Sequence, residues 1–198
     1  KLISSKEITS NRIFTVTWDR ALDPDGFEIE RAIVQHRGSA VMMPVDEKNR
    51  ILLVRQYRLP ARRYLWELPA GTVDPGEKPL QTARRELIEE TGLRAKKWRK
   101  LAEFYPSPGF LSEKMTIYLV TGLTQGESKP MDDERIKTRW FTEKEVDEMI
   151  RTGKIQDAKT NLGFLRWKRY RLAMKSRADA RRSGMLWLPM WMHAASPT

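Results

Sequence analysis

The sequence of 198 residues contains no cysteine and only two histidines, His36 and His193. Without cysteine the chain can form no disulfide framework, no thiolate nucleophile and no cysteine-based zinc site. Two histidines that lie so far apart in the sequence are also too few for a histidine-based metal cluster. Any metal that this protein binds is therefore expected to be held by oxygen ligands.

Long apolar runs are also missing. No stretch reaches the roughly 18 consecutive apolar residues that a membrane-spanning helix needs. The first 30 residues lack the basic segment followed by an apolar run that marks a secretory leader. We therefore expect a protein that does not span a membrane and is not an obvious secreted precursor.

Acidic residues are fewer than basic ones, and the resulting net charge of +11 is unevenly distributed. Residues 151–184 contain eleven Lys or Arg and only two acidic residues, so this segment carries most of the net charge. Such a basic run can bind nucleic acid or phosphate, but on a helix it more often forms a solvated face. We favour the solvated face and do not expect a nucleic-acid partner.

The composition predicts one globular domain of mixed secondary structure. Hydrophobic residues make up 40% of the chain and charged residues 32%, which is typical of a protein with a packed core. Two alternating segments at 12–18 and 27–35 flank the turn sequence of residues 23–26 (Asp-Pro-Asp-Gly), which predicts a β-hairpin. Strands and helices do not alternate strictly, so we expect an α+β sandwich. Further strands are predicted at 38–45, 51–56, 98–105, 114–121 and 136–141.

Residues 79–91 have the spacing of a helix. Leu80, Ala83 and Leu87 fall on one stripe, a proline opens the segment, and Gly92 follows its last turn. A second helix is predicted at 143–151, with Thr142 and Glu145 as its capping box, and a third from about residue 157 into the 170s.

We divide the chain into an N-terminal hairpin segment (1–37), a main domain (38–175) and a C-terminal tail (176–198). The end of the tail is rich in Trp, Met and Leu but is broken by Pro189 and Pro197. We favour a segment that packs on the domain or on a partner subunit. Disorder and contact with a membrane surface are the alternatives.

The chemistry is expected on the helix at 79–91. Glu86, Glu89 and Glu90 are three or four residues apart, so their carboxylates project from one helix face and repel one another. They are either solvated, partly protonated or bound to a cation, and hard oxygen ligands select Mg²⁺ or Mn²⁺. Because Mg²⁺ shares its coordination shell with phosphates, this face favours a phosphate-containing ligand. Arg85 can pair with Glu89 at a spacing of four residues, and Glu77 in the preceding loop can help to orient Arg85, so both are interpreted as structural residues.

The segment from Gly71 to Leu93 matches the pattern G-x5-E-x7-R-E-U-x-E-E-x-G-U, with U an aliphatic residue, at all nine specified positions. The sequence therefore resembles the Nudix hydrolases. The resemblance implies a Nudix-type α/β/α sandwich with a mixed sheet and hydrolysis of a nucleoside diphosphate linked to another moiety. It also implies Mg²⁺, or Mn²⁺ in its place, as the cofactor.

Flanking motifs resemble the ADP-ribose pyrophosphatase branch of this family over about residues 5–165. They are the segments 55–58 (Arg-Gln-Tyr-Arg) and 66–71 (Trp-Glu-Leu-Pro-Ala-Gly), together with Pro108, fifteen residues after Leu93. This branch implies a cytoplasmic homodimer, joined through the N-terminal hairpin, that splits ADP-ribose into AMP and ribose 5-phosphate.

The resemblance also implies roles for individual residues. The carbonyl of Ala70, with Glu86 and Glu90, would bind the metal, and Glu89 would lie close by as a further ligand or catalytic group. The substrate would contact Arg58 through a phosphate, Glu67 at the nucleotide end, Pro108, and Arg31 from the partner subunit. Trp18 and Phe27 are candidates for stacking on adenine. Surface, core or interface roles are the alternatives for these side chains.

The general base that deprotonates the attacking water needs another carboxylate if those of the helix bind metal. Glu113 is one candidate, and Glu134 with its neighbour Asp133 is the other. In the branch that the sequence resembles, the base comes from the later loop, so we favour Glu134 over Glu113.

Two other functions compete with ADP-ribose hydrolysis. A hydrolase of another nucleoside diphosphate sugar, such as GDP-mannose, would use the same helix with different base and sugar contacts. A non-catalytic module that binds a nucleotide or RNA would use the basic C-terminal helix instead. Such a module has no need for three mutually repelling carboxylates, so the intact set of Glu86, Glu89 and Glu90 argues against it.

Overall fold

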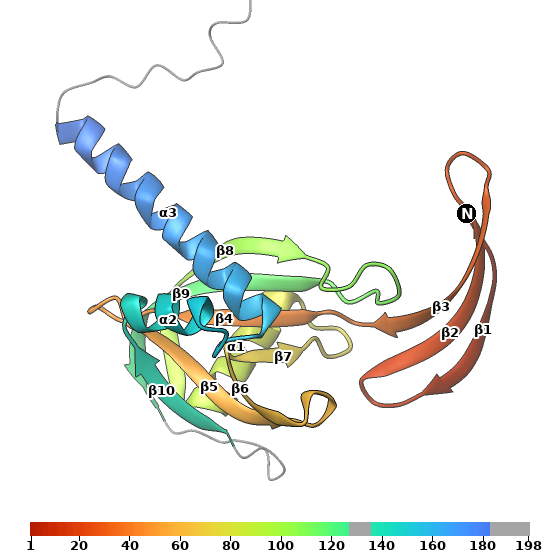
Figure 1. The fold of residues 1–198 in the computed structure, drawn as a ribbon, viewed down its shortest axis with the longest axis horizontal. Coiled ribbons are helices and arrows are strands. Elements are labelled where there is room, and N and C mark those ends of the chain that lie inside the picture. Colours follow the sequence, from red (N-terminus) through yellow and green to blue (C-terminus); the bar gives the residue numbers. More distant parts are fainter. Residues whose placement is uncertain (127–135, 183–198) are drawn as a thin grey trace, which may run out of the picture.

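The computed structural model describes residues 1–126 and 136–182, and its N-terminal part is a three-stranded antiparallel sheet that projects from the rest of the chain (Figure 1). The strands are β1 (Leu2–Ser10), β2 (Phe14–Leu22) and β3 (Glu28–His36), in that order. The predicted hairpin is confirmed as the β2–β3 pair. The sequence analysis missed β1, because every residue of this strand is exposed and no apolar face marks it.

The remaining strands form two sheets. One has the order β7-β4-β9-β8 and the other β10-β5-β6. β4 pairs with β9 in parallel, whereas its pairing with β7 is antiparallel, so the predicted mixed sheet is confirmed. The bounds are β4 (Ser39–Pro44), β5 (Ile51–Arg58), β6 (Arg63–Glu67), β7 (Ala70–Thr72), β8 (Leu93–Phe104), β9 (Met115–Gln125) and β10 (Lys137–Phe141), with a 3-10 turn at Leu59–Ala61.

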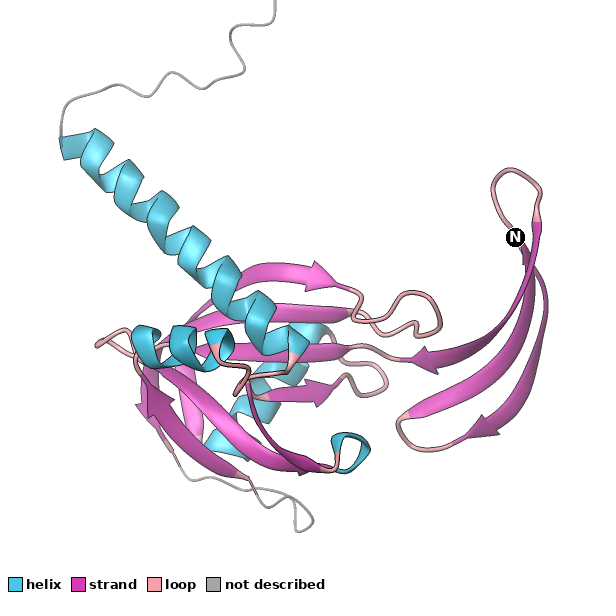
Figure 2. Ribbon diagram, in the orientation of Figure 1, coloured by secondary structure: helices cyan, strands magenta, loops and turns pink. Residues whose placement is uncertain are grey.

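Helices cover both faces of the sheet that contains β4 (Figure 2). Alternate side chains of β4 point to opposite faces. Ala40 and Met42 belong to one buried cluster with α1 (Pro79–Thr91). Val41 and Met43 belong to the other, which includes Phe164 and Trp167 of α3 (Ala158–Arg182). The expected α/β/α sandwich is therefore present, and β4 contributes side chains to the cores on both faces of the sheet.

The predicted ends of two helices are confirmed. α1 begins at Pro79 and ends before Gly92, whose φ of 69° is the left-handed conformation that glycine adopts without strain. α2 (Glu143–Arg151) is capped by the predicted pair. The Glu145 N–H donates to the Thr142 hydroxyl at 3.2 Å, and the Thr142 N–H donates to the Glu145 carboxylate at 2.7 Å.

The helix α3 is longer than predicted, because it continues to Arg182. Its first half packs on the sheet through the buried Phe164 and Trp167, whereas Leu172 is 66% exposed on the half that leaves the body (Figure 1). Within the part of the chain that the structure describes, no helix is long and apolar enough to cross a membrane.

Gly163 allows α3 to lie close to the sheet. A Cβ atom at this position would stand 2.7 Å from the Cδ1 atom of Leu68, which is itself buried. Alanine favours a helix over glycine by about 1 kcal/mol, but overpacking costs about 1–3 kcal/mol. We therefore expect Gly163→Ala to lower the free energy of unfolding by about 1 kcal/mol in urea titrations. Gly109→Ala, whose Cβ would meet no atom within 4 Å, is the control, and a gain in stability for Gly163→Ala would contradict the expectation.

Candidate active site

The three carboxylates of the predicted metal helix lie on one face of α1, beside β7. Glu90 is only 5% exposed, and its carboxylate accepts a hydrogen bond of 3.2 Å from the backbone N–H of Ala70. Glu86 lies against Gly71, since a Cβ atom on Gly71 would stand 2.0 Å from the Glu86 Cδ atom. Position 71 therefore has to be glycine for the Glu86 carboxylate to reach this strand.

The backbone of Ala70 adds an oxygen atom to this face. β7 is an edge strand, and the Ala70 N–H points away from β4 towards Glu90. In an antiparallel ladder the N–H and C=O groups of one residue point to the same side, so the Ala70 carbonyl faces α1 as well. One carbonyl and three carboxylates are the hard ligands that Mg²⁺ and Mn²⁺ prefer, so the donor chemistry fits the predicted ion.

Arg85 forms hydrogen bonds with several carboxylates of the acidic face. Its Nη1 atom donates to Glu86 at 2.6 Å and to Glu89 at 3.0 Å, as predicted for the latter pair. Its Nε and Nη2 atoms donate to Glu77 at 3.2 and 3.1 Å, and Asp74 lies 3.1 Å from Nη2. With the carboxylates arranged in this way, the described residues contain no group of three acidic or histidine side chains in metal-ligand geometry. A divalent ion therefore has to compete with Arg85 for oxygens of Glu86 and Glu89.

The same guanidinium group shifts the ionisation of Glu77. Hydrogen bonds from Arg85 and from the Thr82 hydroxyl lower the pKa of Glu77 from 4.5 to about 2. The charged carboxylate is therefore favoured in the folded state. This contribution to stability is fully present above the ordinary pKa of the carboxyl group and is lost as the pH falls through about 2.

We expect Glu77→Gln to lower the free energy of unfolding at pH 7 by on the order of 1 kcal/mol, the range of partly exposed ion pairs. The difference from the unsubstituted protein should shrink as the pH falls from 4.5 towards 2, because the protonated carboxyl group then resembles the amide. Urea titrations in EDTA across this pH range would test it. A difference that stays constant down to pH 2 would show that Glu77 acts by packing alone.

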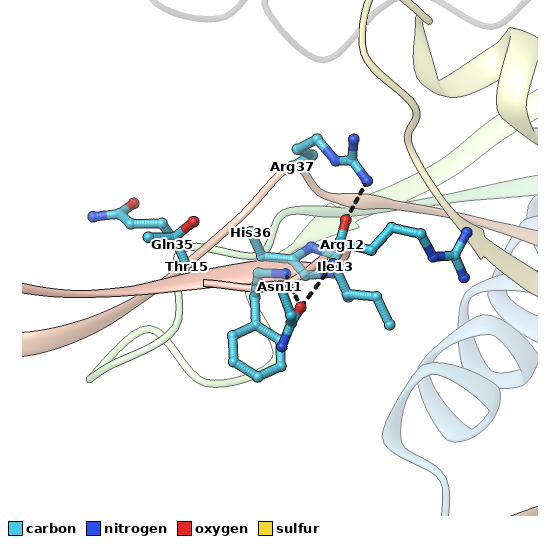
Figure 3. A pocket seen from close by; sticks show the side chains of 8 residues that line it. Asn11, Arg12, Ile13, Thr15, Gln35, His36 and Arg37 are labelled. Atoms are coloured by element: carbon cyan, nitrogen blue, oxygen red, sulfur yellow. Dashed lines mark hydrogen bonds between the residues drawn. The ribbon is translucent and has the colours of Figure 1, made fainter. Parts of the chain in front are cut away.

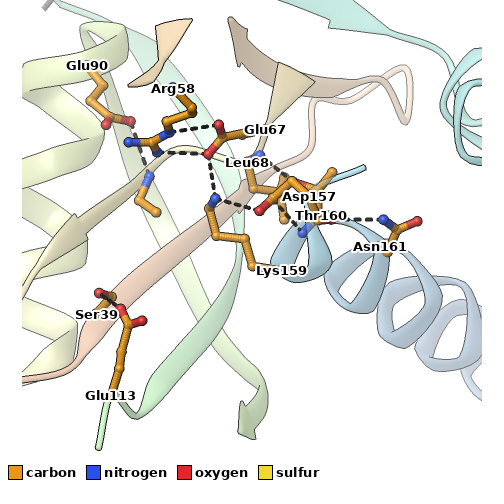
Figure 4. Close-up of polar contacts among 11 residues, drawn as sticks. Ser39, Arg58, Glu67, Leu68, Glu90, Glu113, Asp157, Lys159, Thr160 and Asn161 are labelled. Atoms are coloured by element: carbon orange, nitrogen blue, oxygen red, sulfur yellow. Dashed lines mark hydrogen bonds and ion pairs between the residues drawn. The ribbon is translucent and has the colours of Figure 1, made fainter. Parts of the chain in front are cut away.

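A buried ionic network lies beside the acidic face (Figure 4). Arg58 on β5 donates two hydrogen bonds of 2.8 Å, from Nε and Nη2, to the two carboxylate oxygens of Glu67. Lys159 at the start of α3 donates to Glu67 at 2.5 Å and to Asp157 at 2.9 Å. Burial opposes the charged form of Glu67, but the hydrogen bonds from Arg58 and the charge of Lys159 lower its pKa below the ordinary value. The network therefore fixes the end of β6, just before Ala70 begins β7.

A family model described as NUDIX domain matches residues 35–164. The chain belongs to the NUDIX family. It is 35% identical to an ADP-ribose pyrophosphatase of Bacillus subtilis (strain 168), over 81% of this chain and 88% of the relative. It is 36% identical to an ADP-ribose pyrophosphatase of Mycobacterium tuberculosis, over 82% of this chain and 80% of the relative. The crystal structure of an ADP compounds hydrolase shares its fold, with a TM-score of 0.73 at 17% identity, over 94% of this chain and 96% of that chain.

Five other residues that were predicted for the site and are described by the structure lie apart from the acidic face of this NUDIX domain. Glu113 accepts a hydrogen bond from the Ser39 hydroxyl, away from Glu90 and Arg58 (Figure 4). Pro108 is exposed in the loop between β8 and β9, which is bonded to β3. Arg31 is exposed on the projecting sheet, where its guanidinium donates to the Glu30 carbonyl. Trp18 and Phe27 are also exposed, and Glu134 and Asp133 lie outside the described residues.

The acidic face of the NUDIX domain opens into a cleft with a cavity volume of about 210 Å³. Ala70, Gly71, Glu86 and Glu89 line one part of it. The lining also includes Arg12, Ile13 and Arg37, which the sequence analysis did not identify. No local pattern could identify them, because they flank the β2–β3 hairpin and reach the cleft only through the tertiary fold.

Proposed function

We propose that this protein is a Mg²⁺-dependent hydrolase that splits ADP-ribose into AMP and ribose 5-phosphate. The observation that carries the proposal is that Glu86 and Glu90 contact the Ala70–Gly71 strand, while Glu86 and Glu89 line the cleft beside it. The names of the two relatives, at 35% and 36% identity, support ADP-ribose as the substrate. We place the enzyme in the cytoplasm and propose that it acts as a homodimer, with Mn²⁺ as a possible substitute for Mg²⁺.

In this mechanism the Ala70 carbonyl with Glu86, Glu89 and Glu90 would hold the divalent ions. When bound, such ions neutralise the pyrophosphate charge and activate the attacking water. Glu90 is held in place by the Ala70 N–H, and Arg85 orients Glu86 and Glu89 from the side. The bond from Ala70 can persist when the ions bind, whereas Arg85 would have to release oxygens of Glu86 and Glu89 to them.

Two residues of the network are proposed to contact the substrate. Arg58 uses its Nε and Nη2 atoms on Glu67, so its remaining Nη1 edge is the part that could reach a phosphate oxygen. Glu67 is 1% exposed, so it would act mainly by positioning Arg58. Arg31, Pro108, Trp18 and Phe27 stay proposed contacts in a dimer, where residues of the projecting sheet would approach the partner's cleft.

A turnover panel tests the proposed function. ADP-ribose, GDP-mannose, ADP-glucose, UDP-glucose, NADH and diadenosine polyphosphates would each be incubated with Mg²⁺ and the products identified by chromatography. We expect ADP-ribose to have the highest kcat/KM and to give AMP and ribose 5-phosphate. A higher kcat/KM for another nucleoside diphosphate sugar would reassign the substrate, and no turnover of any compound would contradict the proposal.

The proposed general base is Glu134, with Glu113 as the alternative. Substitution of the general base should lower kcat by about a hundredfold or more, with little change in KM. We expect this result for Glu134→Gln and not for Glu113→Gln, because the Glu113 carboxylate is bonded to Ser39 and does not line the cleft. Steady-state kinetics of these variants and of Asp133→Asn would identify which carboxylate acts as the general base. If only Glu113→Gln loses kcat, the base lies in the β8–β9 loop.

A further inference from the structure

The junction between the projecting sheet and the NUDIX domain contains a second hollow, with a cavity volume of about 390 Å³ (Figure 3). Arg12, Ile13 and Arg37 line both this hollow and the cleft beside α1. These three residues therefore form a ridge between two adjoining cavities. The other residues that line the second hollow are Asn11, Phe14, Thr15, Gln35 and His36.

The four arginines of the cleft differ in what they bind. Arg85 is bonded to carboxylates through all three of its nitrogen atoms, and Arg58 through two. Arg12 and Arg37 have no acidic residue within ion-pair distance in the described part of the chain. Among residues 1–126 and 136–182, they are the arginines of the cleft that form no ion pair with a carboxylate.

A hydrogen bond links Arg37 to the backbone of Arg12. The Nη2 atom of Arg37 donates a hydrogen bond of 3.0 Å to the backbone carbonyl of Arg12. The Arg12 side chain extends away from Thr15 and Gln35, which lie on the side of the second hollow (Figure 3). An anion that enters the cleft can accept charge-assisted hydrogen bonds from guanidinium groups that form no ion pair with a carboxylate.

We propose that Arg12 and Arg37 form an anion subsite that binds a phosphate group of a nucleoside diphosphate-linked substrate. This inference rests on the proposed function and assigns the phosphate contacts within it. The acidic face of α1 lies on one side of the ridge, and the second hollow lies on the other. The substrate therefore crosses the ridge at its diphosphate and places one of its end groups among Phe14, Gln35 and His36.

The experiment compares Arg12→Gln, Arg37→Gln and the double variant with Arg169→Gln. Arg169 is an exposed arginine of α3, so its substitution removes the same charge away from the cleft. Binding of inorganic pyrophosphate, and of an ADP-ribose analogue with a methylene group between its phosphates, would be measured by calorimetry in EDTA. KM and kcat for ADP-ribose would be measured in Mg²⁺, and thermal unfolding would show that each variant is folded.

Each single variant should weaken binding of both probes by about 10-fold or more, the range for one charge-assisted hydrogen bond. KM should rise by a similar factor, with kcat changing by less than about threefold, and Arg12→Lys should restore part of the affinity because it keeps the charge. Arg169→Gln should match the unsubstituted protein.

An affinity of the double variant for pyrophosphate that equals that of the unsubstituted protein would overturn the subsite. A loss of pyrophosphate affinity in Arg169→Gln as large as in the Arg12 and Arg37 variants would also overturn it. The two proposals can fail separately. If the enzyme hydrolyses no compound of the turnover panel while the double variant still loses pyrophosphate binding, the proposed function is wrong and the subsite is supported. If ADP-ribose is hydrolysed with the same KM by all variants, the function is supported and the subsite is wrong.

Discussion

Replacing Glu90 by glutamine should lower kcat/KM for ADP-ribose by about a thousandfold or more while the protein stays folded. The amide oxygen of glutamine can still accept the hydrogen bond from Ala70, so β7 keeps its contact with α1. The lost charge weakens binding of a divalent ion whose effect on the transition state is worth several kcal/mol, which corresponds to roughly this factor. Steady-state kinetics at saturating Mg²⁺ would measure the loss of kcat/KM. Circular dichroism of the variant and of the unsubstituted protein would show whether the fold is retained.

The matched control is Glu103→Gln. Glu103 forms ion pairs with Lys100 and Lys114 on the sheet surface and does not line the cleft, so its loss should leave turnover unchanged. Calorimetric titration with Mn²⁺ gives a second readout that does not depend on the substrate. Unchanged turnover and Mn²⁺ affinity in Glu90→Gln would refute the assignment of Glu90 as a metal ligand.

Removal of residues 1–37 should abolish activity and leave a monomer. The projecting sheet exposes apolar side chains, with Leu2 60%, Ile8 56% and Phe27 70% accessible, and such positions are typical of a surface that a partner covers. The deletion would also remove Arg12, Arg31 and Arg37 from the proposed site. Sedimentation velocity and turnover of the full chain and of the truncated chain would measure both effects.

A second variant separates association from loss of the strands. The double variant Ile8→Glu/Phe27→Glu keeps all three strands but places a charge at two exposed apolar positions. We expect it to fold, to sediment as a monomer and to lose activity. A full-length chain that sediments as a monomer with full turnover would contradict the composite dimeric site.

The sequence was most informative where the determinants of structure are local. α1 was predicted with its observed ends because Pro79, the apolar stripe and Gly92 act within a few residues of one another. Glu86, Glu89 and Glu90 could be grouped for the same reason, since helical spacing alone puts them on one face. β1 was missed because a strand with two exposed faces carries no periodic apolar signal.

Contacts between distant segments could not be predicted from single-sequence patterns. Lys159 was one basic residue among many in a charged segment, yet it pairs with Glu67, 92 positions away. Arg12 and Arg37 reach the cleft because β3 continues into β4, and no motif marks either residue. The unexpected extension of α3 to Arg182 has a similar cause, because its second half makes few contacts that would impose an apolar stripe.

The pairing of Glu67 with Lys159 has a consequence for the order of folding during synthesis. A nascent chain that has emerged only as far as α2 already contains the strands and α1, but it lacks Lys159 and the Thr160 hydroxyl that accepts the Leu68 N–H. At that stage Glu67 has only Arg58 to balance its buried charge, and a buried carboxylate with incomplete pairing is costly. Pairing of the Glu67 carboxylate is therefore completed only when α3 has been made, so we expect the cleft beside α1 to form late in translation.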